Sequence, residues 1–173
     1  GCLATRNPDV HQAALRMAQG RLSPPGLAQL VAAGATELGP DYFAGVAAAS
    51  PQRRDVLYAG LTRIAGVFLR KPEGAFYFVA RLPILDAEDF ARYLLSDFSH
   101  GGATVMVAPA AGFYATPGAG RDEVRIAYVL KRQDLEQAVE VLAAGLAAYR
   151  KARGLEHPEE ALPARAGADF PGP

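Results

Sequence analysis

Arg125 is the residue of this chain whose type and setting most favour chemistry. It lies in residues 121–129, Arg-Asp-Glu-Val-Arg-Ile-Ala-Tyr-Val, whose alternation predicts a β-strand. The two faces of that strand would carry different residues: Val124, Ile126 and Tyr128 on one, and Glu123, Arg125, Ala127 and Val129 on the other. A guanidinium among apolar neighbours needs an anionic partner, and its planar fork fits a carboxylate through two hydrogen bonds. That partner is a ligand, unless Arg125 forms a structural ion pair or reaches solvent.

Two sequence blocks precede this strand and favour a ligand. Residues 72–78 read Pro-Glu-Gly-Ala-Phe-Tyr-Phe, and residues 105–118 read Val-Met-Val-Ala-Pro-Ala-Ala-Gly-Phe-Tyr-Ala-Thr-Pro-Gly. With Arg-Ile-Ala-Tyr following, the order resembles the C-terminal small domain of the pyridoxal-phosphate-dependent aminotransferases of classes I and II, of the aspartate aminotransferase type. The resemblance runs from residue 1 to about residue 153. It implies that Arg125 grips the α-carboxylate of an amino-acid substrate.

The same resemblance implies two further substrate-binding residues. Phe113 lies in the Gly/Pro-rich loop before the Arg125 strand, where the family places a Phe beside the substrate. A packing aromatic in a surface loop explains Phe113 equally well. Ser23 falls where the family contributes residues across the dimer to the neighbouring subunit's pocket, although Ser23 also suits the cap of a helix. A contact of Arg21 with a distal substrate group is a weaker hypothesis.

The chain lacks the residue that the family uses for covalent chemistry. In the family a lysine forms a Schiff base with pyridoxal phosphate, and it lies shortly before the point at which this chain begins. Lys71, Lys131 and Lys151 are the lysines present, and none has that sequence context. We therefore assign no catalytic residue and expect the cofactor-binding residues to lie mostly outside this chain. The chain is expected to be the C-terminal part of a longer protein and inactive alone.

Composition gives no support for several other classes of function, such as nucleic-acid binding, membrane insertion and metal binding. Hydrophobic residues make up 50% of the 173 residues, enough to bury a core. Because 18 basic residues balance 18 acidic ones, charge gives no reason to expect nucleic acid or an anionic membrane. No long apolar run predicts a membrane span, and Cys2 alone cannot form an intrachain disulfide. The histidines share no ligand spacing with Cys2, so no metal site is predicted, and a cytoplasmic location is the default.

Periodicity predicts an α/β fold. We expect helices at 8–19, 24–38, 40–64, 86–98 and 133–153, and strands at 67–69, 74–82, 104–108 and 123–129. Asn7 and Asp86 suit the N-caps of the first and fourth helices, and Pro51 raises a kink or break near Ser50 as an alternative within the third. Together they would form a two-layer small domain, with a three- to four-stranded, partly antiparallel sheet covered by helices 86–98 and 133–153 and preceded by long N-terminal helices. The run 75–80, apolar at every position, predicts a central strand covered on both faces. The predicted divisions are a helical segment 1–65, a small domain 66–153 and a flexible tail 154–173.

The resemblance implies a transaminase that moves an amino group between an amino acid and a 2-oxo acid, working as a homodimer with pyridoxal phosphate. Two other functions remain open. The first is an aminotransferase-like domain of a transcription regulator, which would bind an amino-acid effector through Arg125 without turnover. The second is an interaction domain without catalysis.

Overall fold

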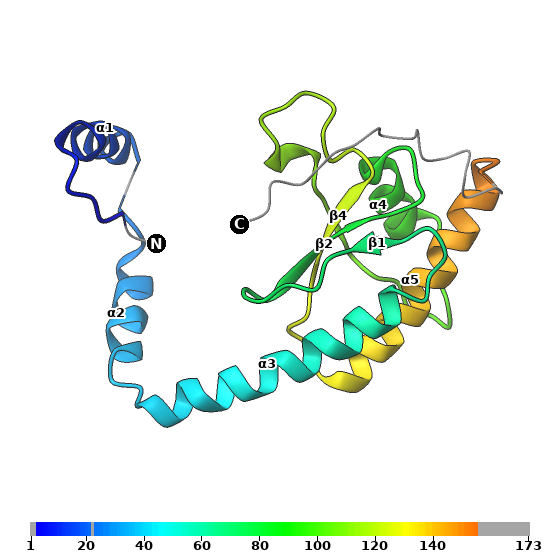
Figure 1. Ribbon diagram of the computed structural model, residues 1–173, viewed down its shortest axis with the longest axis horizontal. Helices are drawn as coiled ribbons and strands as arrows, with labels where there is room; N and C mark the ends of the chain where they lie inside the picture. Colours follow the sequence, from blue (N-terminus) through cyan, green and yellow to red (C-terminus); the bar gives the residue numbers. More distant parts are fainter. Residues whose placement is uncertain (1–2, 22, 156–173) are drawn as a thin grey trace. The chain divides into compact units, whose positions relative to one another are not determined.

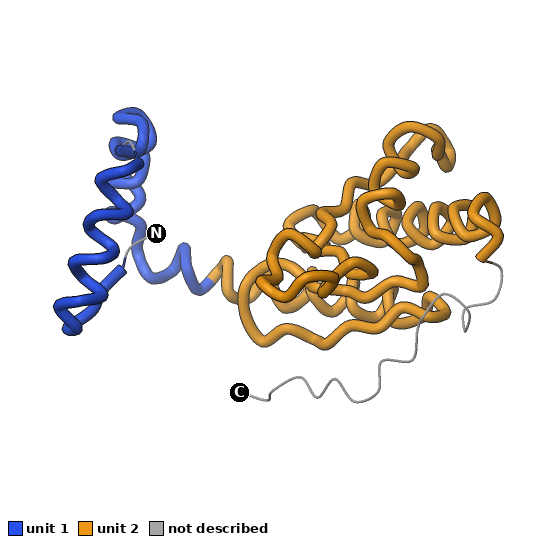
Figure 2. The backbone as a smooth tube through the Cα atoms, turned by 90° about the horizontal axis from the view of Figure 1, so that it is seen from above, with its two compact units in different colours: residues 1–44 blue, residues 45–173 orange. Residues whose placement is uncertain are grey.

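A computed structural model describes residues 3–21 and 23–155 of the chain. These residues belong to two compact units, which divide between Ala44 and Gly45 (Figure 2). Cys2, His157 and the predicted tail beyond residue 155 lie outside the described residues. The predicted division of the sequence at residues 65 and 66 stays a prediction.

The N-terminal unit is helical. It contains α1 (Pro8–Gln19), α2 (Gly26–Ala35) and the first turn of α3 (Pro40–Leu61). Asn7 caps α1 as expected, because its Oδ1 accepts hydrogen bonds from the backbone N–H groups of Asp9 at 2.9 Å and Val10 at 3.2 Å. Local capping therefore sets where this first helix begins.

Helix α3 runs through Pro51 without ending. Proline removes a backbone donor from the helix, and a break near Ser50 was the alternative that this residue raised. The Ser50 hydroxyl instead donates to the carbonyl of Val46 at 2.8 Å, within the same turn of the helix. The C-terminal end of α3 belongs to the second unit, where Leu57 and Leu61 are buried.

The second unit is built on a four-stranded sheet (Figure 1). Its strands are β1 (Phe68–Leu69), β2 (Tyr77–Arg81), β3 (Ala108–Pro109) and β4 (Glu123–Ala127), in the order β1-β2-β4-β3. Each neighbouring pair is antiparallel. The predicted α/β class is confirmed, and the sheet is antiparallel throughout. The strand predicted at 104–108 was placed too early, because only residues 108 and 109 pair with β4.

One face of the sheet carries the hydrophobic core. Phe78, Ala80, Val124 and Tyr128 are buried there with residues of the end of α3, of α4 (Ala87–Ser96) and of α5 (Arg132–Ala152). Helix α4 begins at Asp86, whose carboxylate accepts hydrogen bonds from the N–H groups of Glu88 and Asp89. The expected two-layer arrangement follows, because all three helices bury their apolar residues against the same face.

The opposite face of the sheet is open around Arg125 among the described residues. Tyr77, Val79 and Arg125 on this face are exposed. Phe78 and Ala80, which alternate with them on β2 and point to the other face, are buried. The expectation that residues 75–80 are covered on both faces is therefore wrong for the described chain. A run of apolar residues indicates a strand, but which of its faces is covered depends on where the helices pack.

Candidate functional site

The open face of the sheet is the candidate site, and Arg125 lies at its centre. Arg125 belongs to β4, an inner strand, and is paired in register with Val79 of β2 on one side and Ala108 of β3 on the other. Strand pairing on both sides thus holds the backbone from which its guanidinium projects. The site is built on strands, which hold a side chain more rigidly than a loop would.

Two aromatic rings flank the guanidinium of Arg125. Its Cζ lies 4.9 Å from the ring centre of Phe113, which ends a short 3-10 helix, η1 (Ala111–Phe113), and 5.2 Å from the ring centre of Tyr77 on β2. Both distances lie within the range of cation–π attraction. The two rings restrict where the guanidinium can move.

Arg125 has no carboxylate partner within the described parts of the chain. The ion pairs there join other residues, so the guanidinium is not part of a structural salt bridge. The expectation that Arg125 lies among apolar residues away from water is wrong, because the side chain is exposed and reaches solvent, as the second alternative from the sequence had it. An exposed, ring-flanked guanidinium with an unused fork can bind a carboxylate bidentately.

The loop of residues 110–120 carries Phe113 to Arg125 and is fastened to β4 at Glu123. The backbone carbonyl of Glu123 accepts from the N–H of Ala110 at 2.9 Å, and its N–H donates to the carbonyl of Gly120 at 3.1 Å. The Glu123 carboxylate accepts a hydrogen bond from the Tyr114 hydroxyl. Tyr77, Tyr114 and Glu123 were not identified from the sequence, because their proximity to Arg125 depends on strand register and loop conformation.

Ser23 lies in the N-terminal unit, in an exposed segment before α2. It does not cap that helix: the N-cap position is Pro25, and no side chain caps it. The structural alternative for Ser23 is thereby wrong, and its proposed contact with a substrate stays a prediction. Phe113, in contrast, lies directly beside Arg125, where the sequence analysis expected it to border a substrate.

The lysines do not lie on the open face of the sheet. Lys71 pairs with Asp55 of α3 at 2.9 Å and lies 5.8 Å from the ring centre of Tyr58, which stacks on the covered side against Phe78. Hydrogen bonds from Arg54 and then Lys71 lower the pKa of the Asp55 carboxyl. Lys131 and Lys151 lie at the two ends of α5, which covers the other face. The described residues of the open face therefore fit a carboxylate and provide no amine beside it.

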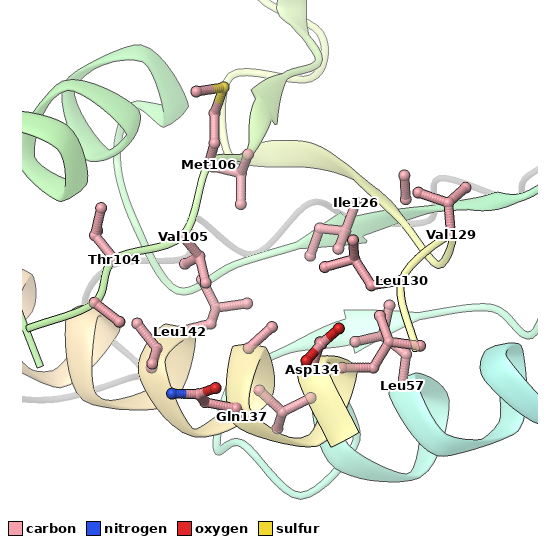
Figure 3. Close-up of a pocket in the computed structure, with 17 residues that line it drawn as sticks. Leu57, Thr104, Val105, Met106, Ile126, Val129, Leu130, Asp134, Gln137 and Leu142 are labelled. Carbon is pink, nitrogen blue, oxygen red and sulfur yellow. The ribbon is translucent and has the colours of Figure 1, made fainter. Parts of the chain in front are cut away.

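A separate cavity of about 550 Å³ lies on the covered side of β4, towards α5 (Figure 3). Ile126 of β4 and Val105 line it together with Leu142 of α5, and Asp134 and Gln137 supply polar groups. Neither Arg125 nor Phe113 lines this cavity. Arg125 and Phe113 thus belong to the open face and not to this cavity.

The described helices show no segment that is both long and apolar enough to cross a membrane. Over the same residues, no group of three or more His, Cys, Asp or Glu side chains is arranged to hold a metal ion.

The chain matches the model of the family "Aminotransferase class I and II" over residues 1–142. It is 29% identical to an aspartate aminotransferase of Rhizobium meliloti over 143 residues, which make up 76% of this chain and 32% of the relative. The chain therefore spans about a third of the length of this curated relative.

Solved aminotransferase structures share the fold. The aspartate aminotransferase of Rhizobium meliloti aligns with a TM-score of 0.55 at 28% identity, over 77% of this chain and 34% of that one. The α-aminoadipate aminotransferase LysN of Thermus thermophilus, solved with N-(5'-phosphopyridoxyl)-L-leucine, aligns with a TM-score of 0.64 at 24% identity. That alignment covers 84% of this chain and 37% of LysN, and at this identity it indicates the fold alone.

Proposed function

Because the chain belongs to the class I and II aminotransferases, we propose that it is the C-terminal part of a pyridoxal-phosphate-dependent transaminase. The complete protein would transfer an amino group between an amino acid and a 2-oxo acid. The relatives named above support this reaction, and the chain spans about a third of their length.

In this proposal Arg125 binds the α-carboxylate of the substrate. The observation that carries it is the exposed guanidinium that has no carboxylate partner among the described residues and is flanked by Tyr77 and Phe113. A bidentate contact fixes both the position and the rotation of the carboxylate. Such fixing of geometry lowers the entropic part of the reaction barrier.

Phe113 and Ser23 have supporting roles in the proposed site. Phe113, on its loop, would border the bound substrate and shield the Arg125–carboxylate contact from water, which strengthens a hydrogen bond between charged groups. Ser23 would reach the substrate pocket of the neighbouring subunit in a homodimer. Both assignments come from the family pattern.

Pyridoxal phosphate, when bound, supplies the electron sink that the chemistry requires. The phosphopyridoxyl amino acid in the LysN complex supports this cofactor for the family fold. The contribution of this chain is to orient the amino acid, since its described open face offers an arginine and aromatic rings but no lysine. We assign the cofactor-holding residues to the part of the protein outside this chain.

The Arg125→Lys variant of the complete protein tests the proposal. Lysine keeps the positive charge but loses the planar fork, so we expect kcat/KM to fall at least about tenfold, which corresponds to about 1.4 kcal/mol. Cofactor binding, followed by absorbance, should stay nearly unchanged. Arg121→Lys is the matched control, because Arg121 forms an exposed ion pair with Asp86 and should tolerate the change.

Wild-type kcat/KM in Arg125→Lys would contradict the role of Arg125. A complete protein that binds an amino acid without turnover would instead indicate an effector-binding domain, and one that binds no amino acid an interaction domain.

A further inference from the structure

Glu123 is the one charged side chain that is buried among the described residues, with 8% of its surface exposed. It lies two residues before Arg125 in β4, so both side chains belong to the same face of the strand. Within the described chain it forms no ion pair, although Arg81 is its partner in register on β2. A buried carboxylate that forms no ion pair is costly, and an apolar side chain could fill the same place. Packing alone therefore does not explain why this residue is a glutamate.

The described contacts of Glu123 are with the loop that carries Phe113. Its backbone hydrogen bonds hold Ala110 at one end of the loop and Gly120 at the other. Its carboxylate accepts the hydrogen bond from the Tyr114 hydroxyl. The two ends and the middle of the loop are thus held at a single residue of β4.

Gly120 completes this attachment by providing space for the Tyr114 ring. Its φ of +70° is in the left-handed region that favours glycine, and a Cβ at this position would overlap ring carbons of Tyr114. The ring of Tyr114 therefore lies directly against the backbone at Gly120. This contact and the hydrogen bond to Glu123 fix both the ring and the hydroxyl of Tyr114.

Phe113 directly precedes Tyr114 in the loop. The Phe113 side chain is 64% exposed, so burial of its own ring contributes little to holding it over Arg125. The backbone of η1 links the two residues, since the N–H of Phe113 donates to Ala110 and that of Tyr114 donates to Ala111. A fixed Tyr114 therefore restricts the backbone of Phe113, whose ring lies 4.9 Å from the Arg125 guanidinium.

We propose that Tyr114 and Glu123 are positioning residues that hold Phe113 over Arg125 and so preorganise the guanidinium for the carboxylate of an amino acid. The inference rests on the proposed function, which assigns that carboxylate to Arg125. Neither positioning residue touches the substrate. Their effect is on substrate affinity, because a guanidinium that is already held in place loses less freedom on binding.

Steady-state kinetics of the complete protein test the catalytic part of the inference. In Tyr114→Phe, which loses only the hydroxyl, we expect KM for the amino acid to rise about fivefold to tenfold while kcat stays within about twofold, the pattern of lost uniform binding. Glu123→Leu should behave like Tyr114→Phe, and the double variant should be no worse than either. Glu123→Gln keeps a carbonyl oxygen that can accept the hydrogen bond from the Tyr114 hydroxyl, so its KM should stay close to that of the wild type. The control Tyr93→Phe removes a hydroxyl from α4, on the covered side.

Equal KM in Tyr114→Phe and wild type would overturn the inference. A loss of kcat without a change in KM would overturn it as well, since that result places the two residues in the chemical step.

A nuclear magnetic resonance measurement on the full 173-residue chain tests the geometry without requiring activity. The ring of Phe113 should shift the Nε–Hε resonance of Arg125. The difference between that resonance in the wild type and in Phe113→Leu, which lacks the ring, measures this shift. We expect Tyr114→Phe to move the resonance at least halfway to its position in Phe113→Leu. An unmoved resonance would overturn the inference. The resonance could instead move while Arg125→Lys leaves kcat/KM unchanged in the complete protein. That result would overturn both the proposed function and the role of Tyr114 and Glu123 in substrate binding, although it would show that they hold the loop.

Discussion

Asp89 links helices α4 and α5 through the ends of two side chains. Its carboxylate accepts a hydrogen bond from the Tyr149 hydroxyl at 2.8 Å and from the Nε and Nη2 of Arg153 at 2.8 Å and 2.9 Å. The hydrogen bond from Arg153 and then that from Tyr149 lower the pKa of Asp89. Burial, followed by the hydrogen bond to Asp89, raises the pKa of Tyr149 to about 12. Both shifts favour the neutral tyrosine beside the charged carboxylate.

The raised pKa of Tyr149 predicts a loss of stability at alkaline pH. A group whose pKa is raised by folding stabilises the protein fully below its unfolded pKa, about 10 for tyrosine, and that contribution is lost as the pH rises to about 12. We expect the free energy of unfolding to fall over this interval by about 2 kcal/mol more in the wild type than in Tyr149→Phe. Urea unfolding at several pH values measures this free energy. Tyr42→Phe, which changes an exposed tyrosine of the N-terminal unit, is the control. Parallel pH profiles for wild type and Tyr149→Phe would contradict the prediction.

The lowered pKa of Asp89 acts at the acidic end. The stability that Asp89 contributes is present above the unfolded pKa of aspartate, about 4, and is lost as the pH falls through the lower folded pKa. Protonation of Asp89 at low pH and ionisation of Tyr149 at high pH therefore both weaken the α4–α5 contact.

At the scale of elements, helices α3 and α5 approach closely at Gly60. A Cβ on Gly60 would lie 2.7 Å and 2.8 Å from the two methyl carbons of Val139 and 3.2 Å from its Cβ. A β-branched side chain cannot turn both methyl groups away by rotating. The glycine thus sets the distance between two of the helices that cover the sheet.

Gly60→Ala should destabilise the protein by about 1–3 kcal/mol, because the added methyl group overpacks this contact. The cost should exceed the roughly 0.5–1 kcal/mol that alanine gains over glycine within a helix. Gly45→Ala in the same helix has no atom within 4 Å of the added Cβ and should be neutral or stabilising. Thermal or urea unfolding compares the stabilities of Gly60→Ala and Gly45→Ala. Adding Val139→Ala to Gly60→Ala removes the overpacked methyl groups and should recover part of the lost stability. A Gly60→Ala variant as stable as Gly45→Ala would show that the helices separate freely.

At the scale of the whole molecule, the N-terminal unit exposes large apolar side chains. Leu27, Leu30 and Val31 of α2 are 75%, 73% and 68% exposed. Exposed apolar surface of this kind marks contacts with other protein. In the proposed complete aminotransferase, we expect the part outside this chain, or the second subunit, to cover these residues.

We predict that the chain alone has no transaminase activity. Its lysines lie off the open sheet face: Lys71 is paired with Asp55, and Lys131 and Lys151 lie at the ends of α5. Mixing the chain with pyridoxal phosphate should give no stoichiometric absorbance band of a protein-bound cofactor, and amino donors should not be converted. A band that disappears on changing one of these lysines to alanine would contradict the prediction. The complete protein serves as the positive control.

The sequence by itself determined the features that arise between near neighbours in the chain. Asn7 and Asp86 predicted helix starts because a cap acts within three residues. Alternation separated Arg125 from Val124 on β4 because successive residues of a strand face opposite sides. The ordered blocks 72–78 and 105–118 predicted the family, and the family match over residues 1–142 confirmed it.

Only the tertiary structure decided what depends on residues far apart in the chain. The antiparallel register of β2 and β4 puts Tyr77 beside Arg125, and no local pattern encodes that register. The packing of α3, α4 and α5 on a single face left Arg125 exposed, although its neighbours in sequence predicted burial. The approach of Tyr114 to Glu123 required the fold of a whole loop. Capping and alternation are set by backbone geometry over a few residues, whereas register, coverage and loop closure are set by contacts that form only when the chain has folded.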